Sequence, residues 1–281
     1  MPYLLSHTLF GRRVLSRLSL KLSDEANFYL GCVGPDVFFF DRIPPPVFSS
    51  HQKMLGNLLH HESGDALLAA MLECRGKVSG VDSFIYGMLC HLALDAAEHP
   101  YIESQYQGYD HTRFEVNIDM QLYKEHKAET GVPGQRQRGA DVERINAFVA
   151  ALVERLYSKR IGNAYKRSYR KLLRVHRWTF DPSGRKLKLT RWLDRLIKKP
   201  NCISGFIMAE TLPDLEDCRN LQGREWAAPW KPGVIRNESF DHLFENGVAD
   251  AVRWISLLRE GRVDELKKLL GNISMDKGEV G

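Results

Sequence analysis

Apolar residues recur three and four positions apart through most of the chain, which is the spacing of one helix face. The clearest example follows Asp141, where the apolar positions are Val142, Ile145, Phe148, Val149, Leu152 and Leu156. We find no convincing alternation of apolar and polar residues of the kind that marks a β-strand. The pattern therefore predicts an all-α protein.

Helix-capping residues and helix breakers set the expected boundaries. The expected helices cover residues 6–18, 23–31, 80–97, 110–127, 141–156, 239–259 and 263–270. MLGNLLHHESGDALLAAMLEC, at residues 54–74, indicates the end of one helix, a turn and another helix. Pro100 is expected to end the third of these near His99, because proline lacks a helical N–H and clashes with the preceding turn. The residues after Gly271 are expected to form a frayed tail. TGVPGQRQRG, at residues 130–139, has no periodicity and indicates a linker.

Histidines and acids are concentrated between residues 86 and 119. They fall four residues apart in two sets: His91, Asp95 and His99, and then His111, Glu115 and Asp119. Residues four apart lie on one face of a helix, so each set can point into one site. Apolar residues separate them, and buried ionisable groups must be paired or coordinated. A lone pair of this kind is usually a surface pair, but two sets of zinc-type ligands predict a metal site.

Charge and cysteine content limit the classes of protein to consider. The net charge of +5 and pI of about 8.9 suit an anionic substrate. The five cysteines are scattered without a paired spacing, which indicates reduced thiols. Neither a signal peptide nor an apolar segment of bilayer length is evident, so we expect a soluble cytoplasmic protein.

The second half of the chain contains a strongly basic stretch. Residues 155–199 hold many lysines and arginines, and their only acids are Asp181 and Asp194. With Tyr165, Tyr169 and Trp178 as stacking surfaces, this stretch could follow a nucleic-acid backbone. The alternative is that these are ordinary basic helices, solvated on one face and packed on the core by the other.

Several short motifs place further ligand-type residues in a specific order. They are SHTLFG around His7, GPD ending at Asp36, G-x-x-x-H ending at His60, HLALD and HP between His91 and Pro100, and H-x-x-x-E from His111 to Glu115. NLQGREWAAPW and NESFDHLFENGVADAV follow near the carboxyl end. In this order the chain resembles the zinc-dependent phospholipase C family, in particular its intracellular relatives, and more distantly the zinc-dependent single-strand nucleases of the same fold. The resemblance covers nearly the whole chain.

The resemblance implies one all-helical domain over residues 1–281 and a cluster of two or three zinc ions. Residues 1–127 would form the metal-binding core, residues 128–140 a linker, and residues 141–281 a basic helical half packed on that core. The implied zinc ligands are His7, Asp36, His60, His91, Asp95, His99, His111 and Glu115. Within this set Asp36, His60, His91 and Asp95 would share one zinc, Asp95 would bridge to the zinc of His7, and His99, His111 and Glu115 would hold another.

The implied activity is hydrolysis of a phosphodiester, such as a phospholipid headgroup. In this family a water between two zinc ions becomes hydroxide near neutral pH and attacks phosphorus. Asp36 would orient or deprotonate that water. Secreted members complete the His7 zinc with an amino-terminal tryptophan, whereas this chain begins with Met1 and Pro2. The expected number of zinc ions is therefore two or three.

Some alternatives stay open at this point. His51 is an alternative to His60, because its distance from Asp36 in the sequence is closer to that of the secreted enzymes. Asp119 is expected to accept a hydrogen bond from a ligand histidine. His61 is expected to point away from the site. The alternative functions are a zinc nuclease acting on single-stranded nucleic acid and a non-catalytic helical scaffold stabilised by metal.

Overall fold

The computed structural model of the chain describes residues 4–40, 51–105, 109–210 and 217–279, and nearly all ordered elements in these ranges are helical. The elements are α1 (Leu4–Arg17), α2 (Glu25–Gly31), η1 (Gly34–Phe40), α3 (His51–His61), α4 (Gly64–Arg75), α5 (Asp82–Gln105), α6 (Tyr109–Thr130), α7 (Val142–Tyr157), α8 (Ala164–Thr179), α9 (Arg185–Leu196), η2 (Ser204–Phe206), α10 (Phe240–Arg259), α11 (Val263–Leu270), β1 (Ile273–Ser274) and β2 (Gly278–Glu279). Here η marks a 3-10 helix. The short strands β1 and β2 pair antiparallel. The predicted all-α class is confirmed.

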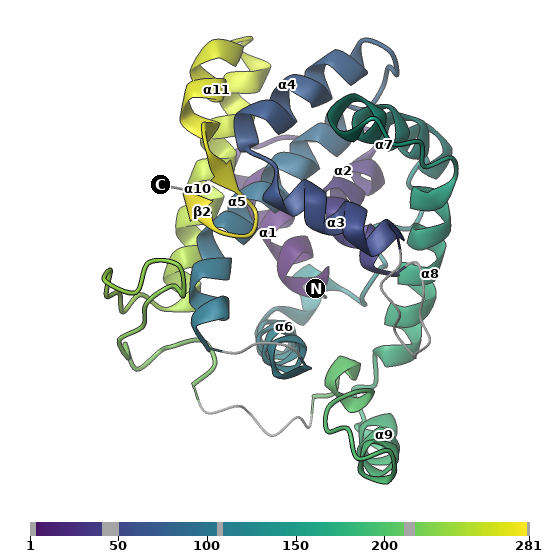
Figure 1. Ribbon diagram of the computed structural model, residues 1–281, viewed down its shortest axis with the longest axis vertical. Coiled ribbons are helices and arrows are strands. Elements are labelled where there is room, and N and C mark those ends of the chain that lie inside the picture. Colours follow the sequence, from purple (N-terminus) through teal and green to yellow (C-terminus); the bar gives the residue numbers. More distant parts are fainter. Residues whose placement is uncertain (1–3, 41–50, 106–108, 211–216, 280–281) are drawn as a thin grey trace.

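The long helix α5 lies in the middle of the molecule, with α1 and α2 beside it and α10 along another side (Figure 1). It is buried on nearly all faces between Ser83 and Ile102. A helix enclosed on all sides needs apolar residues around its whole circumference, as the sequence IYGMLCHLALDAA provides. Polar groups on α5 therefore face the interior.

Two glycines let α2 and α5 approach closely. A Cβ atom on Gly31 would lie 2.2 Å from the carbonyl oxygen of Phe84, and one on Gly87 would lie 2.1 Å from that of Phe28. Both contacts are with backbone, which cannot move aside as a flexible side chain can. Cys32 comes directly after Gly31, and His91 lies one helical turn after Gly87. The close approach of the two helices therefore brings the carbonyl of Cys32 next to His91.

Two expected boundaries are wrong. Pro100 lies inside α5, which continues to Gln105 instead of ending near His99. The carbonyl of Ala96, which Pro100 cannot bond, faces β2, where a Cβ on Gly278 would lie 2.8 Å from it. The segment after Gly271 was expected to be a frayed tail, but its described part, residues 272–279, is ordered. It forms the β1–β2 hairpin and buries Met275 completely.

The turns that follow α6 are anchored to the amino-terminal helices. Gln137 is fully buried, and its side-chain amide donates to the Thr8 hydroxyl and to the carbonyl of Tyr29, each at 3.3 Å. Its own carbonyl accepts from the Tyr169 hydroxyl at 2.7 Å. These bonds connect the 131–140 segment with α1, α2 and α8.

No helix in the described ranges combines the length and apolarity needed to cross a bilayer.

Candidate metal centre

Asp36 and His60 come from the short helices η1 and α3 and meet in the interior. Asp36 lies in the first turn of η1, directly after Gly34 and Pro35. His60 lies in the last turn of α3, and its Nε2 is 3.1 Å from Asp36 Oδ1 and 3.5 Å from Asp95 Oδ2. His60 thus lies beside Asp36 and Asp95, whereas the side chain of His51 lies outside the described residues. His61 is mostly exposed and pairs with Asp276, as expected for a residue pointing elsewhere.

The helical spacing on α5 brings its three predicted residues together. Asp95 Oδ2 lies 3.2 Å from Nε2 of His91 and 3.9 Å from Nε2 of His99. His91 and Asp95 are buried, and His99 is largely so. The four-residue spacing therefore has the predicted effect of turning the three side chains to one face.

His7 approaches the same carboxylates from α1. Its Nε2 lies 3.4 Å from Asp95 Oδ1 and 3.9 Å from Asp36 Oδ2. The imidazoles of His7 and His91 stack with their centroids 4.5 Å apart. Asp95 is accordingly the residue on which four histidines from three helices converge.

Backbone carbonyls fix three of these imidazoles through the ring nitrogen that faces away from Asp95. His91 Nδ1 lies 3.0 Å from the carbonyl of Cys32, His60 Nδ1 2.8 Å from that of Gly56, and His99 Nδ1 2.6 Å from that of Met275. A carbonyl can only accept, so Nδ1 carries the proton and Nε2 points into the cluster. The sequence offers no signal for these partners, because every residue has a carbonyl.

His111 and Glu115 lie side by side on α6 and form a hydrogen-bonded pair. His111 Nδ1 is also 3.2 Å from Glu103 Oε1 on α5, a partner that the sequence did not indicate. The histidine is thereby held between two carboxylates from two helices. The hydrogen bond from His111 lowers the pKa of Glu103, and the nearby charge of His99, which belongs to the Asp95 cluster, adds to this effect.

Asp119 has a different partner from the one expected. Its carboxylate accepts from the backbone N–H groups of Leu5 and Ser6, at 3.1 and 2.9 Å, and from the Ser6 hydroxyl. These N–H groups belong to the first turn of α1, which has no helical acceptors for them. Asp119 therefore anchors the start of α1, the helix that carries His7, rather than a ligand imidazole. Burial raises its pKa to about 7.

Burial and charge act in opposite directions within the Asp95 cluster. Burial lowers the pKa of His7 to about 3, and the neighbouring His91 adds to this effect. Burial also opposes a charge on His60, but hydrogen bonds to Asp36 and Asp95 raise its pKa well above the usual value. For Asp95 itself, burial favours the neutral acid, yet the surrounding imidazoles hold its pKa well below the usual range. The cluster thus contains ionised carboxylates in a buried place, which favours a cation among them.

The positions of these side chains fit a zinc ion. Two sets bring one ligand atom per residue to within 4.8 Å of each other: His7, His91 and Asp95, and Asp36, His60 and His91. Ligands of tetrahedral zinc lie roughly 3.4 Å apart for bonds of about 2.1 Å, close to four of the separations in the cluster, which run from 3.1 to 3.5 Å. His91 Nε2 is buried and makes no hydrogen bond within the described part of the chain. A buried nitrogen in that state is a suitable metal ligand.

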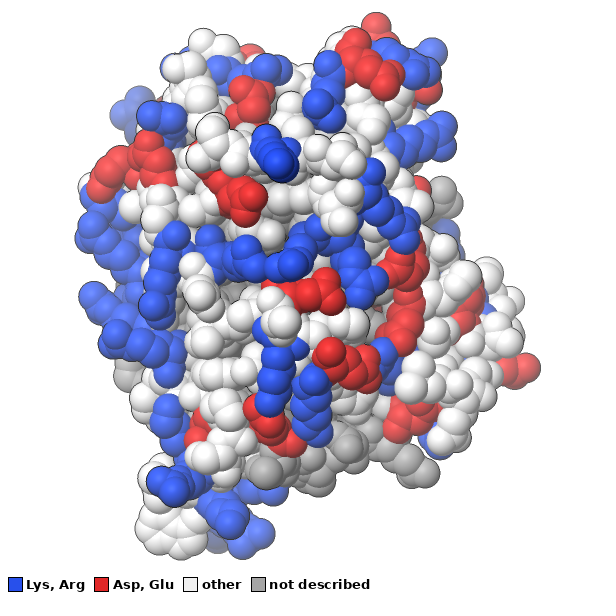
Figure 2. All heavy atoms as spheres, turned by 180° about the vertical axis from the view of Figure 1, so that it is seen from behind, with Lys and Arg blue, Asp and Glu red and all other residues white. Residues whose placement is uncertain are grey.

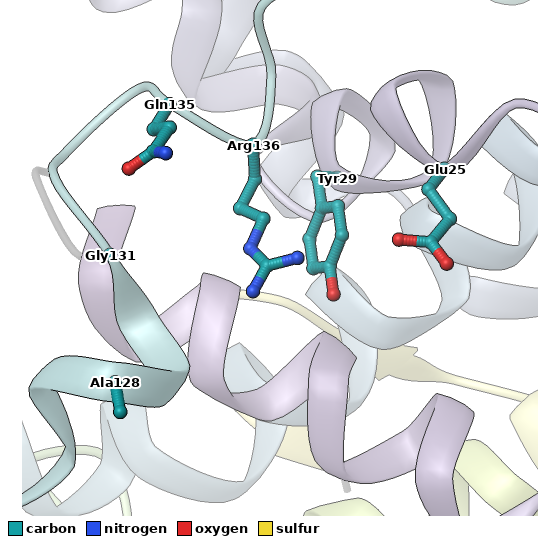
Figure 3. Close-up of a pocket in the computed structure, with 6 residues that line it drawn as sticks. All are labelled: Glu25, Tyr29, Ala128, Gly131, Gln135 and Arg136. Carbon is teal, nitrogen blue, oxygen red and sulfur yellow. The ribbon is translucent and has the colours of Figure 1, made fainter.

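A separate surface hollow of about 430 Å³ lies between α2 and the segment that follows α6. Glu25, Tyr29, Gln135 and Arg136 line it, and none of the clustered histidines or acids does (Figure 3). The Arg136 guanidinium lies over the Tyr29 ring, 5.5 Å from its centroid. The hollow is therefore distinct from the metal centre.

Tyr165, Tyr169 and Trp178 do not form the exposed stacking surface that nucleic-acid binding would need. Tyr165 and Tyr169 are buried, and their hydroxyls donate to the carbonyls of Gly34 and Gln137. Only Trp178 of the three aromatic residues is exposed. Trp226 is buried against Tyr101, as an anchor of its loop.

A helical fold with a buried centre of histidines and aspartates is typical of metal-dependent hydrolases. Comparison with protein families matches residues 6–174, more than half of the chain, to the family described as zinc dependent phospholipase C. The chain belongs to this family. No curated protein and no solved structure matches the chain.

Proposed function

We propose that the chain is a zinc-dependent phosphodiester hydrolase of the phospholipase C type. The observation that carries the proposal is the convergence of His7, His60, His91 and Asp36 on Asp95 in the interior. Membership of the family supports zinc as the metal and a phosphodiester, such as a phospholipid headgroup, as the substrate.

In this proposal two or three zinc ions bind per chain. Their ligands are His7, Asp36, His60, His91, Asp95, His99, His111 and Glu115. Bound zinc would polarise the phosphodiester and lower the pKa of a water molecule for attack on phosphorus. Asp36, whose two carboxylate oxygens face His60 and His7, would orient that water and accept its proton. The three backbone carbonyls hold the imidazoles in place for this work.

The proposal also includes one domain, formed by a metal-binding half over residues 1–127, a 128–140 linker and a basic half over residues 141–281. A hydrophobic core shared by residues from Leu4 to Met275 supports it. The cysteines, which are free thiols in the described ranges, support a cytoplasmic location.

The test is hydrolysis of p-nitrophenyl phosphocholine and bis-p-nitrophenyl phosphate by the purified chain. We expect turnover that a chelator abolishes, that added zinc restores, and that Asp36→Asn reduces at least about 100-fold. His61→Asn, at the exposed neighbour of His60, is the control and should keep full activity. Zinc binding without turnover of either substrate would refute the hydrolase and leave the metal-stabilised scaffold. Cleavage of single-stranded DNA alone would identify a nuclease instead.

A further inference from the structure

Helix α9 presents apolar residues on both of two opposite faces. Leu187, Thr190 and Asp194 are buried on the inner face. Leu189, Trp192 and Leu196 follow one another at spacings of three and four residues, so they share the opposite face. They are 58%, 54% and 61% exposed, and Ile197 next to them is 48% exposed.

The inner face is sufficient to hold α9 on the molecule. Leu187 packs in a small apolar cluster with residues of α1, α6 and the segment after η2. Asp194 accepts from the backbone N–H groups of Ile203 and Ser204, at 2.9 and 3.0 Å. The outer stripe therefore plays no part in attaching the helix. Single exposed apolar residues are common, but a stripe of large ones on the outer face of an attached helix indicates an interaction surface.

Cations border this apolar stripe. The basic residues of the helix and its carboxyl end are Arg185, Lys186, Lys188, Arg191, Arg195, Lys198 and Lys199. None of them forms an ion pair with a carboxylate among the residues that the structure describes. Figure 1 shows α9 projecting from one end of the molecule, and Figure 2 shows Lys and Arg atoms beside white atoms on the same projection, at the lower left.

A hollow of about 350 Å³ lies on the flank of the helix. Arg191, Arg195 and Lys198 line it together with Asn201 and Ser204. The carboxylate of Asp194, which also lines it, is engaged with backbone N–H groups. The hollow therefore offers cationic side chains to an anionic group of small size.

We propose that α9 is a membrane-docking helix, which inserts Leu189, Trp192 and Leu196 into the interface of a bilayer that contains anionic phospholipids. An interfacial helix has this combination of a tryptophan and leucine face with flanking lysines and arginines. The cations would meet lipid phosphates, and the hollow beside Arg191 and Arg195 would receive a headgroup. A nucleic-acid backbone would use the cations but would have no use for exposed leucines. The proposal goes beyond the hydrolase activity, because docking requires no metal and none of the clustered histidines.

The experiment measures flotation of the full chain with vesicles, in the presence of a chelator so that hydrolysis does not interfere. We expect binding to vesicles of phosphatidylcholine with about one-third phosphatidylglycerol, and binding about tenfold weaker to pure phosphatidylcholine. The double variant Trp192→Ala/Leu196→Ala should weaken binding about tenfold or more, because it removes apolar groups that enter the interface. Lys188→Glu/Arg195→Glu should remove the preference for anionic vesicles.

Leu221→Ala is the matched control, because Leu221 is 63% exposed and lies outside α9. It should leave vesicle binding unchanged, and all variants should keep the wild-type circular dichroism and the wild-type activity on soluble phosphodiesters. Equal loss from Leu221→Ala would overturn the proposal in favour of non-specific adsorption. Binding to single-stranded DNA that depends on the cations but not on Trp192 and Leu196 would also overturn it. So would a solution dimer that the Trp192→Ala/Leu196→Ala variant dissociates.

Discussion

At the scale of single residues, Asp95 determines how the centre is organised. Its two oxygens face different histidines, with His7 near Oδ1 and His60 and His91 near Oδ2. A carboxylate in this position can serve two metal ions at once, whereas a neutral imidazole has only one nitrogen lone pair to offer. Its effect on the histidines differs: hydrogen bonds to Asp36 and Asp95 raise the pKa of His60 well above the usual value, whereas burial keeps the pKa of His7 and His91 low.

Asp119 provides a prediction at this scale, because it holds the first turn of α1 in place and so positions His7. Asp119→Ala would leave the buried N–H groups of Leu5 and Ser6 without their acceptor. We expect a loss of unfolding free energy of about 1–3 kcal/mol, together with weaker zinc binding. Urea denaturation and zinc titration measure the two effects.

Ser239→Ala is the matched control, since Ser239 caps α10 by accepting from the N–H of His242. It should cost about 1 kcal/mol of stability without changing zinc affinity. If both substitutions alter zinc binding equally, Asp119 has no specific role in placing His7.

At the scale of elements, the close contact of α2 with α5 sets the position of His91. Gly87→Ala would force the two helices apart, because the new methyl group would meet the carbonyl of Phe28. We expect a loss of about 1–3 kcal/mol in unfolding free energy. Zinc affinity should also fall, since His91 would lose its 3.0 Å contact with the carbonyl of Cys32.

Gly233→Ala is the control, because a Cβ there has no atom within 4 Å. It should change neither quantity. Wild-type zinc affinity in Gly87→Ala would show that the helix contact does not position the centre.

The elements also show what can be predicted from the sequence. Periodicity and capping residues predicted the all-α class and the helices α1, α2, α5, α6, α7, α10 and α11. The four-residue spacing predicted that His91, Asp95 and His99 share a face. The predicted helix end at Pro100 is wrong, because α5 continues past the proline. Whether a helix tolerates a proline depends on what lies beside the carbonyl that it leaves unbonded. Here that neighbour is β2, which is distant in the sequence. The carbonyls of Cys32, Gly56 and Met275 could not be predicted at all, since only the packing of helices brings them to their histidines. The observed partners of Asp119 differ from the predicted histidine, because the sequence does not show that α6 crosses the start of α1.

At the scale of the whole molecule, buried neutral histidines make stability depend on pH. His176 is fully buried against Phe40, and burial lowers its pKa to about 4 against the opposing charge of Asp36. In the unfolded chain its pKa returns to about 6.5, so between pH 4 and 6.5 the unfolded state binds more protons. The contribution of His176 to stability is therefore complete above pH 6.5 and is lost as the pH falls through this window.

His176→Gln should reduce this loss. We expect the wild-type protein to lose more unfolding free energy between pH 7.5 and pH 5 than the variant does, by on the order of 1 kcal/mol. Urea denaturation of both metal-free proteins at the two pH values gives the difference. An equal loss in the two proteins would mean that His176 does not remain neutral when folded.

The most direct test of a zinc centre organised by Asp95 is the zinc content of the purified chain after equilibration with zinc and removal of the excess. We expect two or three zinc ions in the wild-type protein and in the exposed-site control His61→Asn. We expect the loss of at least one ion in Asp95→Asn, with weaker binding of those that remain. A zinc content that is the same in Asp95→Asn as in the wild-type protein, or no zinc in either, would contradict such a centre.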